Sequence, residues 1–83
     1  MSSLRKIGPQ RRAVVVTPDD DNNLDQPANC LYVGTGGTVT VDTSGGDTQV
    51  EFTVPSGGII PVEIVRVRAT GTDADNIVAL RDR

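Results

Sequence analysis

The 83-residue chain has no histidine, one cysteine and only two aromatic side chains, Tyr32 and Phe52. Without histidine, neither a Ser-His nor a Cys-His nucleophilic pair can form. The single cysteine, Cys30, excludes an intrachain disulfide and, with histidine missing, a structural zinc site. We expect Cys30 to be a small buried hydrophobic residue on a strand rather than a reactive thiol. The sequence therefore predicts a protein that is not an enzyme and carries neither a cofactor nor a metal.

Long apolar runs are also missing. No stretch approaches the roughly 20 apolar residues that a membrane-spanning helix needs. The first residues lack the apolar centre of a secretion signal. We therefore expect a protein that is made in the cytoplasm and has no membrane partner.

Positive charge is absent from the middle of the chain. No Lys or Arg occurs from Ala13 through Val65, although most of the acidic residues fall there. An acidic body repels phosphate, so a nucleic-acid partner is not expected. The first twelve residues instead predict a basic, extended arm that contacts an acidic protein surface, on a neighbouring copy or on another protein. The basic residues of this arm are Arg5, Lys6, Arg11 and Arg12.

Short segments with alternating apolar and polar residues dominate the rest of the sequence. Residues 38–42 and 49–54 alternate cleanly, which predicts two strands joined by a hairpin at the Gly-rich residues 43–47. Further strands are expected at 13–17, 29–34, 59–70 and 76–80. The phase of the alternation within 59–70 changes at Ile64 and Val65, which indicates a bulge or a bend between sheets.

This pattern predicts an all-β fold. No segment shows ten residues of helical periodicity, and the strands recur about every ten residues. We expect a small antiparallel β-sandwich or partly open barrel, as a single domain over 13–83, preceded by the extended N-terminal arm over 1–12.

Three clusters of residues are candidate sites. The acidic loop 19–25 is rich in oxygen ligands, but Leu24 and Cys30 stand where a calcium-binding EF-hand loop needs Gly and Glu. It is therefore expected to be solvated or to dock against arginines of a partner. Residues 34–37 lack the Gly-Lys-Ser/Thr of a phosphate loop and predict a hairpin turn. Asp73 and Asp75 lie on a Gly/Thr turn without an apolar pocket, so raised pKa values are not expected.

The small core predicts a homo-oligomer. A domain of this length buries only about 60–65% of its unfolded surface, and no disulfide or metal supports it. Arg66 and Arg68 share one face of a strand, where they form either an intersubunit salt-bridge ladder or a solvated face. The candidate residues for the subunit interface are Val14, Val15, Val16, Ile59, Ile60, Arg66 and Arg68.

Several segments in order resemble a known family. They are VTPD at 16–19, LYVGTGG at 31–37, VPSGGIIPV at 54–62, and VRATGT at 67–72 followed by IVAL at 77–80. Together, over about residues 13–80, they are similar to the head-spike base proteins of tailed phages and gene transfer agents. The resemblance implies a compact, oligomeric β domain on the outer surface of the virion head, bound to the major capsid protein. It also implies a spike fibre protein as a further partner, and no catalytic residues.

The sequence fits two positions on the head and two functions. A head-spike base occupies fivefold vertices, whereas a capsid decoration or cement protein occupies threefold positions, so trimers and pentamers both fit. A host-surface or carbohydrate-binding β module of a virion is the alternative function. Such sites usually present stacking aromatics, and this chain has only two, both within expected strands.

Overall fold

The computed structural model describes residues 10–82, and within them it contains strands and turns only. None of the described residues belongs to a helix that could cross a membrane. The strands are β1 (Arg12–Val15), β2 (Cys30–Thr35), β3 (Gly37–Thr43), β4 (Val50–Val54), β5 (Gly58–Ile60), β6 (Ile64–Arg68) and β7 (Asp75–Arg81).

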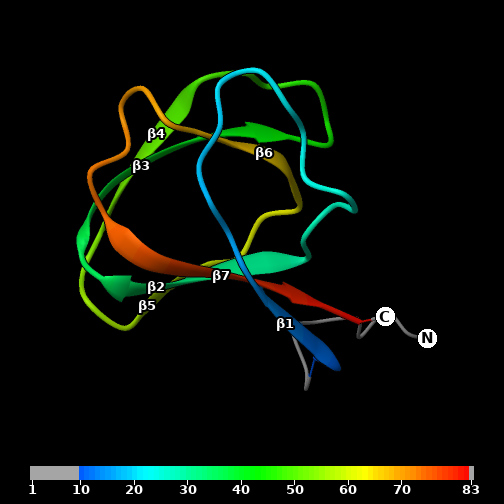
Figure 1. The fold of residues 1–83 in the computed structure, drawn as a ribbon, viewed down its shortest axis with the longest axis horizontal. Coiled ribbons are helices and arrows are strands. Elements are labelled where there is room, and N and C mark those ends of the chain that lie inside the picture. The colour runs from blue at the N-terminus through cyan, green and yellow to red at the C-terminus, as the bar shows by residue number, and fades with distance from the viewer. Residues whose placement is uncertain (1–9, 83) are drawn as a thin grey trace.

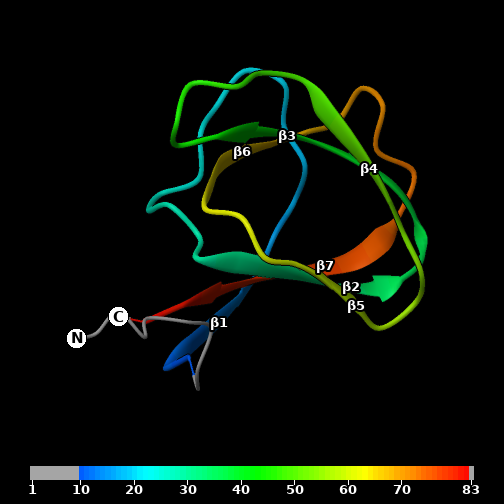
Figure 2. The same ribbon diagram turned by 180° about the vertical axis from the view of Figure 1, so that it is seen from behind.

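The strands form two antiparallel sheets that face each other (Figure 1). One sheet has the order β1-β7-β2-β5 and the other the order β4-β3-β6. Figure 2 shows the same two layers from behind, with β1 and the end of β7 extending beyond the second sheet. The sheets do not close into a barrel, so the predicted all-β fold is confirmed in its sandwich form.

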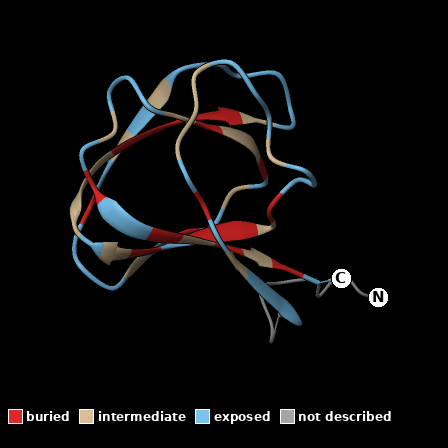
Figure 3. Cartoon of the chain, in the orientation of Figure 1, coloured by how far each residue is buried: buried red, intermediate tan, exposed pale blue. Residues whose placement is uncertain are grey.

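The core lies between the sheets and is built from the alternation that the sequence shows. Leu31 and Val33 on β2 are fully buried, and Tyr32 between them points outward. Val39 and Val41 on β3 face them from the other sheet, and Figure 3 shows the resulting buried bands on both layers. Cys30 is also buried, as expected, and this burial raises the pKa of its thiol.

The hairpin turn predicted at residues 34–37 is wrong, because these residues connect strands of two different sheets. Residues 43–47 do form a hairpin turn, in which the Thr43 amide donates to the Asp47 carbonyl at 2.8 Å. Residues 34–37, by contrast, carry the chain from β2 in one sheet to β3 in the other. Gly36 passes so close to the β4–β5 turn that a Cβ would lie 2.6 Å from the Ser56 amide nitrogen. A glycine is therefore needed for the crossing, and a sequence pattern alone does not distinguish this from a hairpin.

The change of phase predicted at Ile64 and Val65 is a bulge in the pairing of β6 with β3, because Asp42 pairs with Arg66 and Thr43 with Ile64, which leaves Val65 without a partner. The single strand expected over 59–70 is instead two strands, and the change of sheet lies before the bulge. β5 belongs to the four-stranded sheet and β6 to the three-stranded one, so the chain changes sheets between Ile60 and Ile64. The break contains Pro61, which has no amide hydrogen for a ladder bond. β1 starts at Arg12, one residue inside the stretch assigned to the arm. Residues 1–9, with Arg5 and Lys6, lie outside the described residues.

Candidate functional site

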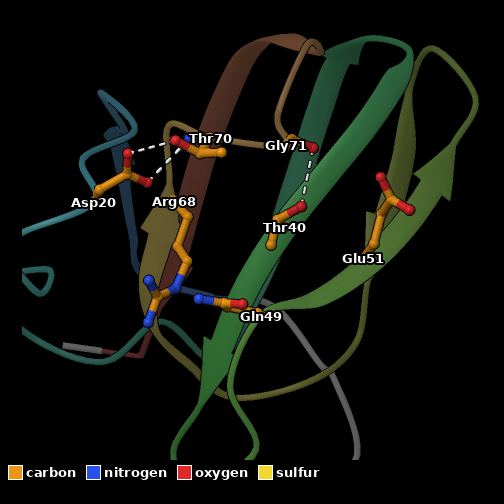
Figure 4. A pocket seen from close by; sticks show the side chains of 7 residues that line it. All are labelled: Asp20, Thr40, Gln49, Glu51, Arg68, Thr70 and Gly71. Carbon is orange, nitrogen blue, oxygen red and sulfur yellow. Dashed lines mark hydrogen bonds between the residues drawn. The ribbon is translucent and has the colours of Figure 1, made fainter.

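An open polar groove lies on the outer face of the three-stranded sheet (Figure 4). Its volume is about 480 Å³. It is bounded by β3, β4 and β6, by the turn after β6 and by the acidic loop. The residues that line it are Asp20, Thr40, Gln49, Glu51, Arg68, Thr70 and Gly71.

The floor of the groove is organised by Asp42 on β3. Its carboxylate accepts two hydrogen bonds from Arg68 on β6, from Nε to Oδ1 and from Nη2 to Oδ2, each 2.8 Å long. A third bond comes from the Gln49 amide at 2.9 Å. Hydrogen bonding to Arg68 is the largest cause that lowers the pKa of Asp42, and the charge of Arg66 adds to it. The site therefore holds a fixed carboxylate–guanidinium pair within one chain.

The acidic loop docks along the free edge of β6. The amides of Asp19 and Leu24 donate to the carbonyls of Val67 and Val65 at 2.8 Å each, in the manner of an added strand. Arg66 fixes the loop from the side, because its Nη1 donates to the Asp20 carbonyl at 2.9 Å. Its Nε donates to the Asn23 side-chain oxygen at 2.9 Å. The arginine that contacts this loop thus belongs to the same chain, which corrects the expectation that the loop docks against arginines of a partner. Asp21 and Asp25 of the loop are exposed, as expected of a solvated loop.

Asp20 closes the groove on the side of the acidic loop. Its carboxylate accepts bonds from the Thr70 amide at 2.9 Å and the Thr70 hydroxyl at 2.7 Å, as Figure 4 shows. These two bonds lower the pKa of Asp20 and hold it ionised. The loop and the β6–β7 turn are consequently tied together across the mouth of the groove.

The β6–β7 turn packs on β3 through Thr40. The Thr40 hydroxyl donates to the Gly71 carbonyl at 2.9 Å, and the Thr40 amide donates to the Thr72 hydroxyl at 2.9 Å. Gly71 has a φ of +88°, and a Cβ there would lie 2.6 Å from the Thr40 hydroxyl oxygen. Both the backbone conformation and the close approach therefore favour glycine.

Asp73, considered above with Asp75 as a carboxylate pair, has a structural role. Its Oδ1 accepts bonds from the Thr38 amide at 2.7 Å and the Thr38 hydroxyl at 3.0 Å. These bonds lower the pKa of Asp73, which is opposite to the shift that a general acid needs. The carboxylate joins the turn to the start of β3.

The arrangement builds a rigid polar surface. Asp20, Asp42 and Arg68 all have partners within the chain, and the carboxylate pKa shifts at Asp20 and Asp42 are downward. Glu51 stands exposed on β4 at the opposite rim. Such a surface can receive hydrogen bonds and ion pairs from a partner, and its own charges are already positioned by hydrogen bonds.

The structure exposes some of the residues expected at the subunit interface and buries others. Val15 and Ile59 are exposed, and Val14 is half-buried. Val16 and Ile60 are 8% and 2% exposed and pack in the hydrophobic core, so they leave almost no side-chain surface for a partner. That part of the expected apolar interface is corrected by burial within the chain.

The charged residues of the expected contacts also lie in two different environments. Arg66 and Arg68 are held by the acidic loop and by Asp42 of the same chain, which is neither of the two environments weighed from the sequence. Arg11 and Arg12 are exposed at the start of β1. The sequence reasoning missed Asp42, although its alternation with Thr40 placed both on the polar face of the strand.

Comparison with known proteins gives a match among solved structures. No family model matches the chain, and no curated protein sequence matches it. A solved structure described as the capsid of a native gene-transfer-agent particle, computed with C5 symmetry, contains a chain of the same fold. The two chains share 36% sequence identity with a TM-score of 0.80, and the match covers 95% of each. The protein therefore belongs to the same family as this chain of the gene-transfer-agent capsid particle.

Proposed function

We propose that the chain is a structural protein of a virion, in a gene-transfer-agent-like or tailed-phage particle. The observation that carries the proposal is the 36% identity to a chain of a capsid particle over 95% of both chains. Identity at this level over the full domain supports a shared role as well as a shared fold. A structural role also agrees with a site whose charged groups are fixed by hydrogen bonds.

The finer proposal is that the chain binds the outside of the major capsid protein shell, as a head-spike base or as a decoration protein. It works there as a homo-oligomer, a trimer or a pentamer, with a spike fibre protein as a further partner of a spike base. The exposed Arg11 and Arg12, with Arg5 and Lys6 of the preceding segment, are the proposed contacts to the shell. Val14, Val15 and Ile59 are the proposed apolar contacts between subunits.

The proposal is tested on purified particles from the organism that encodes the chain. Mass spectrometry should detect the chain in a fixed ratio to the major capsid protein, and imaging should place its density on the outer surface of the head. A ratio set by twelve vertices or fewer supports a spike base, and a ratio set by the threefold positions supports a decoration protein. Absence of the chain from intact particles would refute the virion role.

A further inference from the structure

One apolar row crosses all four strands of the β1-β7-β2-β5 sheet. Val15 on β1 pairs with Val78 on β7, Val78 pairs with Tyr32 on β2, and Tyr32 pairs with Ile59 on β5. Directly paired residues of antiparallel strands project on the same side of a sheet. Leu31 and Val33 on either side of Tyr32 point into the core, so the row lies on the outer face. We call these four residues the apolar row.

The row collects the apolar surface of the molecule. Val15 is 77% exposed, Ile59 51% and Tyr32 38%, and these are the only exposed large hydrophobic residues between Gln10 and Asp82. They come from strands that are far apart in the sequence and meet only through the sheet register. A row of exposed apolar side chains on one face is typical of an interaction surface, whereas single exposed apolar residues are common everywhere.

The face around the row carries no charged side chain. Alternation from the paired residues leaves only neutral residues at the outward positions of the four strands. Cys30 is one of them but is buried, and the others are Ala13, Val15, Tyr32, Gly34, Ile59, Asn76, Val78 and Leu80. The outer face of the other sheet, in contrast, presents Asp42, Glu51, Arg66 and Arg68. The two outer faces therefore have opposite chemistry.

We propose that the apolar row is the surface on which a second copy of this chain docks. This inference rests on the homo-oligomer in the proposed function. Charge favours a second copy at this face. Among the described residues the exposed acidic side chains are spread over the loops, β4 and the first residue of β7, whereas the exposed basic ones are Arg11 and Arg12 alone. Two copies that approach through most other surfaces bring like charges together, and the uncharged face avoids this repulsion.

The size of the row sets the strength of the contact. Four strands at about 4.8 Å spacing give a row about 14 Å wide. A row of this width and one side chain deep covers far less than the roughly 800 Å² per partner that a stable complex buries. Copies should therefore associate weakly in free solution, and firmly only where a scaffold holds them as neighbours and raises their effective concentration.

The test compares the full chain with two charge-matched variants. The first carries Val15→Lys and Ile59→Lys, both on edge strands of the sheet, where lysine is tolerated. The second carries Thr48→Lys and Thr53→Lys, both exposed and outside the row, with Thr53 on the edge strand β4 of the other sheet. Thermal melting establishes that each variant folds. Sedimentation equilibrium then measures self-association up to about 1 mM at 0.15 M salt, without any particle.

We expect the full chain and the Thr48/Thr53 variant to associate with similar constants, and the Val15/Ile59 variant to associate at least tenfold more weakly. Two results would overturn the proposal: a full chain that stays monomeric at 1 mM, or a Val15/Ile59 variant that associates as strongly as the control. If the full chain stays monomeric but the Val15/Ile59 variant loses binding to particles, the row contacts the shell and not a second copy. The measurements of self-association stand whether or not the chain is found in virions, so they are independent of the test of the proposed function.

Discussion

The carboxylate of Asp42 and the guanidinium of Arg68 form a two-point pair between β3 and β6, with both hydrogen bonds 2.8 Å long. The Asp42 side chain is 9% exposed and that of Arg68 is 18% exposed, so water screens the pair only in part. Arg66 approaches the same carboxylate to 3.9 Å. One buried acid thus positions both arginines of β6, and with them the acidic loop.

Replacing this acid should destabilise the fold. Asp42→Asn keeps the shape but removes the charge that both arginines face, and we expect a loss of about 2 kcal/mol in the free energy of unfolding. Urea denaturation at pH 7 measures it. Glu51→Gln, an exposed residue on the neighbouring strand, is the control and should change stability by less than about 0.5 kcal/mol. Equal effects of the two substitutions would show that the pair contributes nothing specific.

Stability should fall in acid. The pKa values of Asp19, Asp20, Asp42 and Asp73 are lowered in the folded chain by hydrogen bonds, with the bond from Arg68 the largest cause at Asp42. A carboxyl group with a lowered folded-state pKa stabilises the protein above its unfolded pKa of about 3.9. That stability is lost as the pH falls through the folded-state value. Urea midpoints should be flat from pH 7 to about pH 5 and fall below pH 4.

The Asp42→Asn variant provides the control for this pH dependence. It lacks one of the four carboxyl groups, so its midpoint should fall less steeply below pH 4 than that of the unmodified chain. A midpoint that rises in acid would contradict the assignment of lowered pKa values, because the unfolded state would then bind fewer protons than the folded state.

Gly71 should tolerate alanine less well than Gly46. Both have positive φ, +88° and +102°, so alanine strains the backbone at each by about 1–3 kcal/mol. At Gly46 nothing lies within 4 Å of an added Cβ, whereas at Gly71 the Thr40 hydroxyl oxygen lies at 2.6 Å. Chemical denaturation of Gly71→Ala and Gly46→Ala therefore isolates the packing of the turn on β3. Equal losses would mean that Thr40 moves aside freely.

Removal of the Asp20 carboxylate should loosen the acidic loop without unfolding the sandwich. Asp20→Ala removes both bonds to Thr70 but leaves the edge bonds of Asp19 and Leu24 to β6. We expect faster hydrogen exchange at the amides of Thr70 and Asp19, and unchanged exchange in β2 and β7. Asp25→Ala in the same loop is the control. Unchanged exchange at Thr70 would show that the loop is held by its backbone bonds alone.

The strands could be predicted from the sequence because alternation has a fixed period of two residues. Val39, Val41 and Phe52 show it directly, and the strands that contain them were expected at nearly the observed bounds. The crossing at Gly36 could not be predicted, since a short glycine-rich link serves equally well as a hairpin or as a passage between sheets. The outcome is decided by the contact with Ser56, twenty residues later.

The polar groove and the apolar row depend on strand register, which local sequence does not contain. Asp42 meets Arg68 only because β3 pairs with β6 rather than with β2. Val15 and Ile59 were singled out as apolar residues, but Tyr32 and Val78 join them only through three strand pairings. The expectation for Arg66 and Arg68, a subunit interface or a solvated face, also differs from the structure, because both arginines contact an acid of the same chain.

The basic residues before β1 and at its first position should carry binding to the particle rather than folding. The Arg11 amide donates to the Arg81 carbonyl at 2.8 Å, and Asn29 donates to the Gln10 side chain at 2.8 Å. A chain that starts at Gln10 therefore keeps these bonds and should melt close to the full chain. A chain that starts at Ala13 loses them and frays β1.

The charge of the four basic residues, and not the length of the N-terminal segment, should determine how tightly the chain binds particles. Exposed ion pairs contribute up to about 1 kcal/mol each, so Ser at Arg5, Lys6, Arg11 and Arg12 should weaken particle binding by about tenfold or more. Replacing Arg5, Arg11 and Arg12 with Lys preserves charge and should restore most of the affinity. Higher salt should weaken the full chain and the Lys variant but barely affect the Ser variant. If the Ser variant binds particles as tightly as the full chain, these residues make no contact with the particle, and the surface that binds it must lie on the β-sandwich itself.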